Sequence, residues 1–384
     1  MGRIPTLSAA LLLACLAMTV APASGGAGRQ EARGARAAYD RAVALEADGN
    51  YPAALSLLWT AAGAAPADAD IQNRLGEALE RIGALDAAVD AYQRALASRA
   101  DFSRAINNLV VALAKAGRGA DAVARAEAWA AAKPADTDRL FTLGLAQADQ
   151  DVEAAMETLR RVITRRPDHA LAHYNLALLL KRVDRLDAAI AAARRSTDID
   201  ARPEAHLALG GLYLQQGDFS RAVTALDAAL AADRRYVEAW VLLGTVHRAR
   251  GDLARSADAL RQAIALRPES WESHAALATV LRLAGDASGA TRESAEAERR
   301  RAADQRERAA VVMTAVGVAR LDAGDAEGAR ERFAAAVGVA DTYAPAHYHL
   351  GRALRRLSRP DDARRAFAAA QRLNPSLIDP GAAR

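Results

Sequence analysis

The sequence predicts an all-α fold, an α-solenoid of about ten helix–turn–helix repeats, because two series of small residues recur along the chain. Members of the first series are 33 or 34 residues apart, with one spacing of 39. This first series consists of Gly76, Val110, Gly144, Ala177, Gly210, Gly244, Ala278, Gly317 and Gly351. The second series keeps the same spacing and consists of Ala54, Ala88, Ala122, Ala155, Ala189, Ala222, Ser256, Ala290, Ala329 and Ala363.

Each repeat is expected to form two amphipathic helices joined by a tight turn. In Asn73–Ile82, the apolar residues Leu75 and Leu79 recur at helical spacing. Gly83 then ends the first helix, because the chain must leave that helix with a positive φ. The same position in other repeats holds Gly117, Gly217, Gly251, Gly285 and Gly324. The second helix, Asp86–Leu96 in this repeat, precedes a turn that in several repeats contains proline, which cannot continue a helix.

The first 23 residues have the pattern of a secretory signal peptide. Arg3 provides a positive charge, Leu7–Val20 is apolar but shorter than a membrane-spanning helix, and Ala21–Ala23 forms an A-x-A cleavage site. Residues 24–34 are expected to form a flexible N-terminal segment. These patterns predict an exported protein, either periplasmic or secreted.

A lipid anchor is the alternative interpretation of the same region. Leu12–Cys15 resembles the lipobox of bacterial lipoproteins, in which Cys15 would be acylated and the protein anchored in the outer membrane. Cys15 is the single cysteine, so a chain cleaved after Ala23 has neither a thiol nor a disulfide.

Composition and motifs argue against several functional classes. Lys and Arg total 51 against 47 Asp and Glu, and these charges are interspersed, so a nucleic-acid partner is not expected. Hydrophobic residues make up 52% but aromatic residues only 4%, which favours closely packed alanine-rich helices. The sequence has no Walker loop, G-x-S-x-G or H-E-x-x-H motif. It therefore predicts no enzyme, no metal site and no cofactor.

One repeat in particular carries a family resemblance. Trp240-x2-Leu243-Gly244 in its first helix is followed by Ser256-x3-Leu260 in its second helix. This pattern resembles the tetratricopeptide repeat family. The resemblance implies a right-handed superhelix with repeats one to eight in residues 35–304, repeats nine and ten in 305–377, and a C-terminal tail in 378–384. It also implies a non-enzymatic scaffold for protein–protein interaction.

The histidines fit a packing role in this family. The position that Trp240 holds in its repeat is occupied elsewhere by His173, His206, His274 and His347. Half-buried histidines with structural hydrogen bonds are therefore favoured over a metal site, although His169 and His173 are four residues apart.

The spacing of 39 places five extra residues before repeat nine. Thr291–Ala310 contains neither Gly nor Pro and is rich in helix formers. One interpretation is a single long helix that interrupts the solenoid. The favoured interpretation is a turn at Ala302–Asp304, with Asp304 as N-cap and Glu307 three residues on, followed by a lengthened first helix.

The resemblance implies that the first helix of each repeat lines a groove that binds partners. Transferred to this sequence, the groove residues are Asn73, Arg74, Asn107, Asn108, Phe141, Tyr174, Asn175, Lys181 and Arg182. Asparagines in consecutive repeats are suited to bind the backbone amides of an extended partner segment. The alternative is that they are solvated residues of a helix face.

The last repeat is strongly basic. From Ala344 onward the chain has eight arginines against three aspartates. A possible site for an anion, an acidic peptide or an anionic lipid surface consists of Tyr348, His349, Arg352, Arg355 and Arg356. The alternative is an arginine-rich solvated end. Phe367 and Leu373 are expected to leave an apolar C-terminal edge, which suggests self-association.

Taken together, the sequence predicts an exported scaffold of the bacterial cell envelope that binds extended segments of partner proteins. The alternatives are a non-catalytic subunit of an envelope enzyme or of a polysaccharide-export or secretion complex, and a lipid-anchored outer-membrane spacer. Membrane contact is expected only through acylated Cys15 or through the basic last repeat.

Overall fold

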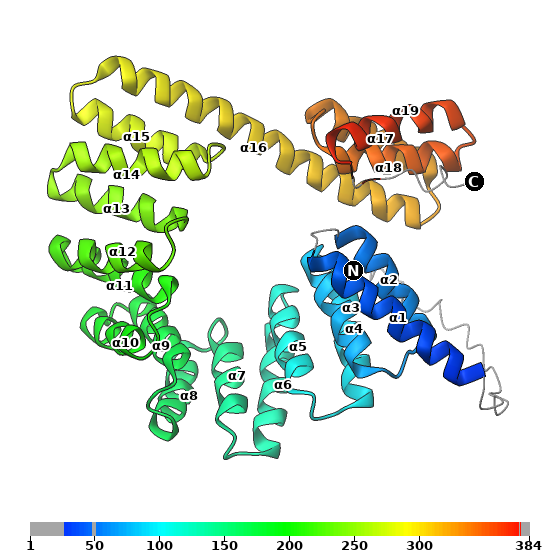
Figure 1. The fold of residues 1–384 in the computed structure, drawn as a ribbon, viewed down its shortest axis with the longest axis horizontal. Helices are drawn as coiled ribbons and strands as arrows, with labels where there is room; N and C mark the ends of the chain where they lie inside the picture. The colour runs from blue at the N-terminus through cyan, green and yellow to red at the C-terminus, as the bar shows by residue number, and fades with distance from the viewer. Residues whose placement is uncertain (1–26, 48–50, 376, 378–384) are drawn as a thin grey trace, which may run out of the picture. The chain divides into compact units, whose positions relative to one another are not determined.

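The computed structural model describes residues 27–47, 51–375 and 377, and within these ranges it contains only helices, turns and loops. The predicted all-α class is therefore confirmed. The described residues form nineteen helices (Figure 1), with the bounds α1 Ala27–Ala47, α2 Tyr51–Ala64, α3 Ala69–Arg81, α4 Leu85–Ser98, α5 Ser103–Lys115, α6 Gly119–Ala132, α7 Thr137–Gln147, α8 Val152–Arg165, α9 Ala170–Arg182, α10 Leu186–Ile199, α11 Pro203–Gln216, α12 Phe219–Ala232, α13 Val237–Arg250, α14 Leu253–Leu266, α15 Trp271–Leu283, α16 Ala287–Asp322, α17 Ala326–Val339, α18 Ala344–Arg356 and α19 Pro360–Leu373. No described helix combines the length and the hydropathy that crossing a membrane requires.

The helices follow the predicted pattern of ten repeats. Ten helical hairpins would need twenty helices, but α16 serves as the second helix of repeat eight and as the first helix of repeat nine, so nineteen suffice among the described residues. The solenoid of repeats predicted from the two series of small residues is confirmed.

The chain divides into two compact bodies. The N-terminal body ends at Ala116 and contains α1–α5, whereas the C-terminal body begins at Gly117 and contains α6–α19. The two helices of repeat three thus belong to different bodies. The predicted boundary near residue 305 stays a prediction.

The predicted N-terminal segments fall mostly outside the described residues. The signal peptide at 1–23 and the lipobox cysteine lie outside the described residues, and so does the predicted C-terminal tail at 378–384. Helix α1 begins at Ala27, so residues 27–34, predicted to be flexible, are helical instead. Six of these eight residues are Ala, Arg, Glu or Gln, which are good helix formers, and they outweigh the two glycines, Gly28 and Gly34.

The two series of small residues pack against each other. A Cβ atom on Gly244 would lie 2.7 Å from Leu260 Cγ and 3.3 Å from the Ser256 carbonyl oxygen. Ser256 is fully buried, and its hydroxyl donates a hydrogen bond to the Gly244 carbonyl at 2.7 Å. Small residues at both positions therefore allow the two backbones of a hairpin to approach closely.

The turn between the two helices contains a left-handed residue in most of the described repeats. The predicted glycines have φ between +74° and +89°, for example +87° at Gly251. In repeats five and ten the same position holds Asp184 and Ser358, which also adopt positive φ values of +56° and +55°. Repeats five and ten therefore keep the turn geometry without glycine. Repeat four does not, since Asp151, which follows Gly144 at the same spacing, has a φ of −148°.

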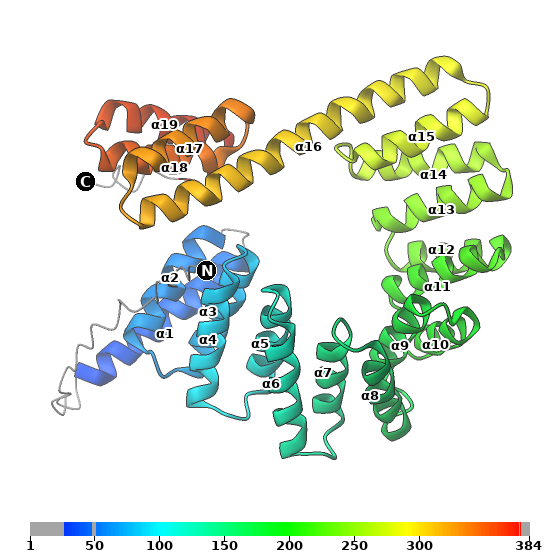
Figure 2. The same ribbon diagram turned by 180° about the vertical axis from the view of Figure 1, so that it is seen from behind.

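The favoured prediction for the spacing of 39 is wrong. Helix α16 runs without interruption for 36 residues, so there is no turn at Ala302–Asp304 and Asp304 is not an N-cap. Asp304 instead pairs with Arg308 at 3.0 Å, one turn further along the same helix. The alternative, a single long helix, is correct because nothing in Thr291–Ala310 breaks the backbone hydrogen bonds. Figure 2 shows α16 reaching from α15 to α17 as one helix.

Enlarging Gly244 should destabilise the fold. We expect Gly244→Leu to lower the free energy of unfolding by about 1–3 kcal/mol, because the new side chain overpacks against Leu260. Chemical denaturation followed by circular dichroism measures this loss. Gly338→Ala is the matched control, since a Cβ there meets no atom within 4 Å and Gly338 is also helical. Equal stability of Gly244→Leu and wild type would contradict the close approach.

A proline scan tests the continuity of α16. Ala303→Pro should cost about 3 kcal/mol of unfolding free energy, because proline in a helix interior removes a hydrogen bond and clashes with the preceding turn. Ala287→Pro, at the first position of the same helix, should be tolerated. Circular dichroism and thermal unfolding of both variants provide the measurement. If Ala303→Pro had the same helicity and thermal stability as Ala287→Pro, a turn near Ala302 would be the better interpretation.

Candidate functional site

A hydrogen bond from the first helix to the preceding turn recurs in five repeats. In each, the side chain at the Trp240 position donates to the carbonyl oxygen six residues earlier. The donors, with their distances, are Gln72 at 3.1 Å, His173 at 3.0 Å, Trp240 at 3.0 Å, His274 at 3.0 Å and His347 at 2.8 Å. The structural role predicted for His173, His274 and His347 is therefore confirmed. His206 is half-buried, and this burial lowers its pKa.

In the N-terminal body, three predicted groove residues belong to one network centred on Glu77. The Glu77 Oε1 atom accepts hydrogen bonds from Asn73 Nδ2 at 2.9 Å and from Asn108 Nδ2 at 3.1 Å. Its Oε2 atom accepts from Arg74 Nη1 at 3.0 Å, and Asn108 also donates to Asn73 Oδ1 at 3.2 Å. One carboxylate thus links the first helices of two repeats, α3 and α5.

Arg74 extends this network to α1. Its Nε atom lies 2.8 Å from Oε2 of the buried Glu46, an ion pair shielded from water. Burial acts to lower the pKa of Arg74, but the hydrogen bond to Glu77 and the charge of Glu46 outweigh it, so the pKa is raised. Arg74 therefore stays charged and ties together α1 and α3.

This network changes the interpretation of the predicted asparagines. Asn73 is only 3% exposed and its amide is bonded to Glu77, so it is a packing residue and does not face a partner. Asn107 is exposed and Asn108 is half-buried. In the C-terminal body, Asn175 donates to the Leu171 carbonyl of its own helix at 2.8 Å. The asparagines thus have different environments and do not form one uniform ladder.

In the C-terminal body, α7 and α9 present an exposed apolar strip. Phe141 and Tyr174 are half-buried, and one helical turn after each of them lie Leu145 and Leu178, which are both 38% exposed. The Phe141 ring centroid lies 4.7 Å from that of His169, the N-cap of α9. We call Phe141, Leu145, Tyr174 and Leu178 the aromatic–leucine strip. On each of α7 and α9, the first helices of two successive repeats, an aromatic residue is followed four positions later by a leucine, so the two side chains are neighbours on the helix surface.

Two exposed cations lie in the last turn of α9. Lys181 is exposed, and Arg182 Nη1 donates to the Ala148 carbonyl at 2.9 Å and to Asp149 Oδ1 at 3.1 Å. Burial and the nearby charge of Glu204 raise the pKa of Tyr174, so its phenol stays neutral at neutral pH. The structure therefore places an uncharged aromatic surface and a positive helix end on the same helix.

The sequence analysis did not select Leu145 and Leu178, although a signal was present. Both follow directly after the recurring small residue, at the position where Glu77 lies in repeat two. In the N-terminal body the same position holds Val111, which is 40% exposed. Exposing three apolar side chains at the same repeat position to water is unfavourable, so this position marks a candidate surface for binding a partner.

The arginines of the basic cluster predicted in the last repeat make contacts within the protein, although Arg355 and Arg356 are exposed. The Arg355 guanidinium lies 4.7 Å from the centroid of the Phe367 ring, and Arg356 donates to the Leu321 carbonyl. Arg352 Nη1 lies 3.3 Å from Nδ1 of His349, which stacks on a ring of α17. Arg355 therefore contacts the second helix of the last hairpin, whereas Arg356 links α18 to α16, and the anion site stays a prediction.

The predicted apolar C-terminal edge is wrong for Phe367. Phe367 is only 2% exposed, because Tyr348 packs edge-on against its ring at 5.5 Å and Arg355 covers it. Leu373 is 43% exposed. Phe367 is thus a core residue of its own hairpin, since a Cβ on Gly351 of α18 would lie 2.9 Å from its ring, and self-association through this end stays a prediction.

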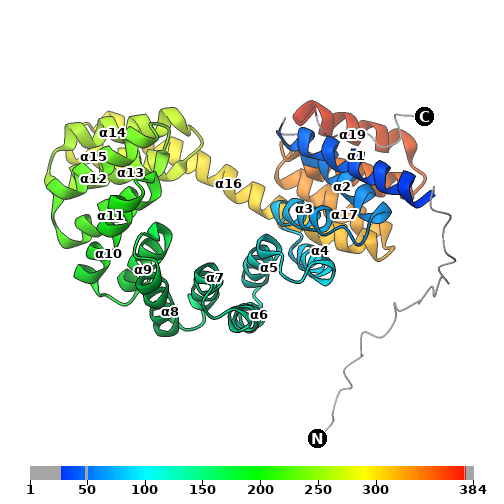
Figure 3. The same cartoon turned by 60° about the horizontal axis from the view of Figure 1, so that its bottom comes forward.

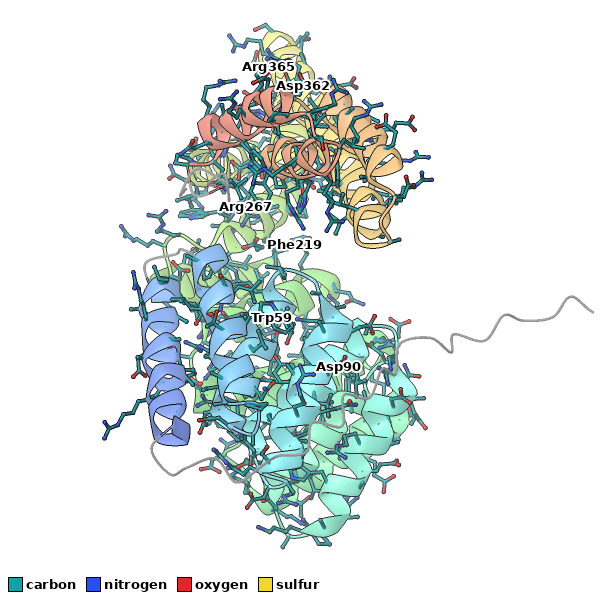
Figure 4. All side chains as sticks on the ribbon, turned by 90° about the vertical axis from the view of Figure 1, so that its right-hand side faces the viewer. Trp59, Asp90, Phe219, Arg267, Asp362 and Arg365 are labelled. Carbon is teal, nitrogen blue, oxygen red and sulfur yellow. The ribbon has the colours of Figure 1, made fainter. Side chains whose placement is uncertain are left out.

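A hollow of about 370 Å³ lies over α17, α18 and α19, and arginines surround it. Two of them, Arg359 and Arg365, pair with Asp362, whose side chain lies beside Arg365 on α19 (Figure 4). The third, Arg330, pairs with Glu327 at 2.7 Å. The hollow thus carries little unbalanced charge. In the part of the chain that the structure describes, no three His, Cys, Asp or Glu side chains are grouped to hold a metal ion.

A tetratricopeptide repeat family model matches residues 28–103, 145–206, 207–270, 241–307 and 315–378. The chain belongs to the tetratricopeptide repeat family. The matched segments cover well over half of the sequence, and their repeat length agrees with the helical hairpins. Tetratricopeptide repeats are protein-interaction modules. No curated protein matches the chain.

Several solved structures have a similar fold. A tetratricopeptide repeat protein from Parabacteroides merdae is 17% identical with a TM-score of 0.49, and the match covers 65% of this chain and 99% of that one. PilW, a type IV pilus biogenesis factor, is 18% identical with a TM-score of 0.47, covering 51% and 92%. Yeast Tom70 is 14% identical with a TM-score of 0.37, covering 89% and 85%.

Removal of Glu77 tests the polar network. We expect Glu77→Ala to lower the unfolding free energy of the N-terminal body by about 2 kcal/mol, because three donors lose their acceptor. Asp40→Ala is the control, since its pair with Arg36 is well exposed on both sides and should contribute less than about 0.5 kcal/mol. Urea denaturation compares the two variants. Similar losses for both would mean that the network adds no stability.

Proposed function

We propose that this protein is an exported, non-catalytic scaffold that binds an extended segment of a partner protein along the first helices of its repeats. The observation that carries the proposal is the aromatic–leucine strip of α7 and α9, whose two leucines are each 38% exposed. Leu145 and Leu178 are too exposed to contribute fully to the core, so their apolar area is available for a partner.

The chemistry of the strip suggests what kind of segment binds. Half-buried Phe141 and Tyr174 provide rigid apolar contacts at low entropic cost, as interface aromatics do. Lys181 and Arg182 favour a segment with an acidic residue near one end. Half-buried Leu207 and Val241 continue an apolar surface on α11 and α13. A partner segment with apolar side chains and a carboxylate therefore fits this surface best.

Export and the envelope location rest on the sequence pattern of residues 1–23. A chain cleaved after Ala23 would act in the periplasm or outside the cell as a partner-binding subunit. Such a subunit would belong to an envelope, secretion or polysaccharide-export assembly, and the scaffold itself would catalyse no reaction.

Substitution within the strip tests the proposed binding surface. The double variant Leu145→Asp/Leu178→Asp should lose the proteins that wild type retains from an envelope extract of the source bacterium, because two carboxylates disrupt the apolar contact. Circular dichroism should show unchanged helicity, since both side chains are exposed. Asn107→Ala/Asn108→Ala/Asn175→Ala tests the asparagines separately. Retention of the same partners by the Asp variant would contradict the strip as binding surface.

Intact-mass measurement of the protein from its native host tests export. Cleavage after Ala23 should remove residues 1–23 and add no mass. Removal of residues 1–14 with added acyl chains on Cys15 would instead establish the lipid-anchored alternative. An uncleaved chain would contradict both forms of export.

A further inference from the structure

The second half of α16 exposes an apolar face that its counterparts in other repeats bury. Val311, Val312 and Val316 are 44%, 64% and 43% exposed, and Ala315 and Ala319 on the same side are exposed too. These five residues are spaced as one helical stripe, which we call the α16 stripe. It lies on the part of α16 that approaches α17 in Figure 3.

Comparison by repeat position shows that this exposure is exceptional. The positions equivalent to Val312 are at most 5% exposed in repeats two to eight and in repeat ten, for example 0% at Ala239 and Ala346. The positions equivalent to Val316 are at most 8% exposed in repeats two to eight, for example 6% at Leu243. Those equivalent to Ala319 are at most 6% exposed, for example 0% at Ala353.

Elsewhere these positions are covered by the second helix of the preceding repeat. On α18, Ala346 packs with Ala336 of α17, and Ala353 packs with Phe333 of α17. On α15, Leu277 packs with residues of α14 that include Leu260. For repeat nine the preceding second helix is the first half of α16 itself, and a continuous helix cannot fold back onto its own face.

The α16 stripe also differs in composition from the corresponding face of repeat one. Repeat one is the first repeat among the described residues, and its equivalent positions hold Ala37, Arg41 and Ala44, which are small or charged. Repeat nine instead has Val312, Val316 and Ala319. Valines at positions that solvent would occupy indicate a covering partner.

We propose that the α16 stripe binds an amphipathic α-helix of a partner protein, which takes the place of the missing second helix and carries acidic residues. The apolar side chains of that helix would follow the spacing of α14, where Leu253, Ala257, Leu260 and Ile264 face α15. This surface lies on different helices from the aromatic–leucine strip, so the inference goes beyond the proposed function.

The charge next to the stripe favours an acidic helix over a second copy of this chain. Residues 299–308 contain five arginines against Asp304 and Glu307, a net charge of +3. Two copies that met through the stripe with their helices parallel would bring two such segments side by side, and like charges repel. A helix with carboxylates on its flanks would instead be attracted.

The experiment measures binding of two synthetic probes to the full chain by fluorescence anisotropy. The first is a lactam-stapled helical peptide with the sequence of α14, Leu253–Leu266. The second carries Arg255→Glu and Arg261→Glu, two positions that are exposed in α14. We expect the acidic peptide to bind about tenfold more tightly than the unchanged one, with a difference that shrinks as salt is added.

Matched variants locate the binding face. Val312→Asp/Val316→Asp should weaken the acidic peptide at least about tenfold, because it places charges against the apolar face. Leu283→Asp, at another exposed apolar residue of the same body, should not weaken it. The strip variant Leu145→Asp/Leu178→Asp should also bind normally, so this inference and the proposed function fail separately.

Three outcomes would overturn the inference. The first is that the acidic peptide does not bind wild type at millimolar concentration. The second is that it binds Val312→Asp/Val316→Asp as well as wild type. The third is a dimer in sedimentation that becomes monomeric in Val312→Asp/Val316→Asp, which would show that a second copy covers the stripe.

Discussion

No first helix of this solenoid can bury its apolar face without the second helix of the repeat before it. The clusters around Leu277 on α15 and Ala353 on α18 both depend on this packing. Because each helical pair is incomplete, stability comes from neighbours in sequence and extends from repeat to repeat. The small residues at Gly244 and Ser256 matter for the same reason, since they set how closely two helices of a pair approach.

Repeats nine and ten differ in how far they follow this rule. Repeat ten follows the rule, and Phe367 is buried within its own hairpin, where it packs beside Gly351 and Tyr348 of α18. At repeat nine, α16 removes the preceding second helix and leaves valines in its place. Repeat ten thus buries its aromatic residue, whereas repeat nine leaves Val312 and Val316 exposed.

Polar groups in the N-terminal body hold neighbouring helices together rather than face a partner. Glu77 accepts hydrogen bonds from Asn73, Arg74 and Asn108, and Glu46 pairs with Arg74. A buried charge must be matched by such partners, because desolvation without them is costly. The network therefore explains why some residues predicted to bind a partner segment are instead engaged in hydrogen bonds within the protein. The exposed leucines of α7 and α9 are the stronger candidates for contacting a partner.

The sequence by itself determined the repeat, the helical pairs, the left-handed turns and the packing role of the histidines, because these depend on residue spacing and on local backbone preference. It did not determine the continuity of α16, since the capping pattern at Asp304 competes with a stretch of strong helix formers. Only the tertiary structure decided that Asn73 is buried while Leu145 and Val312 are exposed. Exposure depends on which neighbouring helix covers a position, and that neighbour lies up to a full repeat away in the sequence.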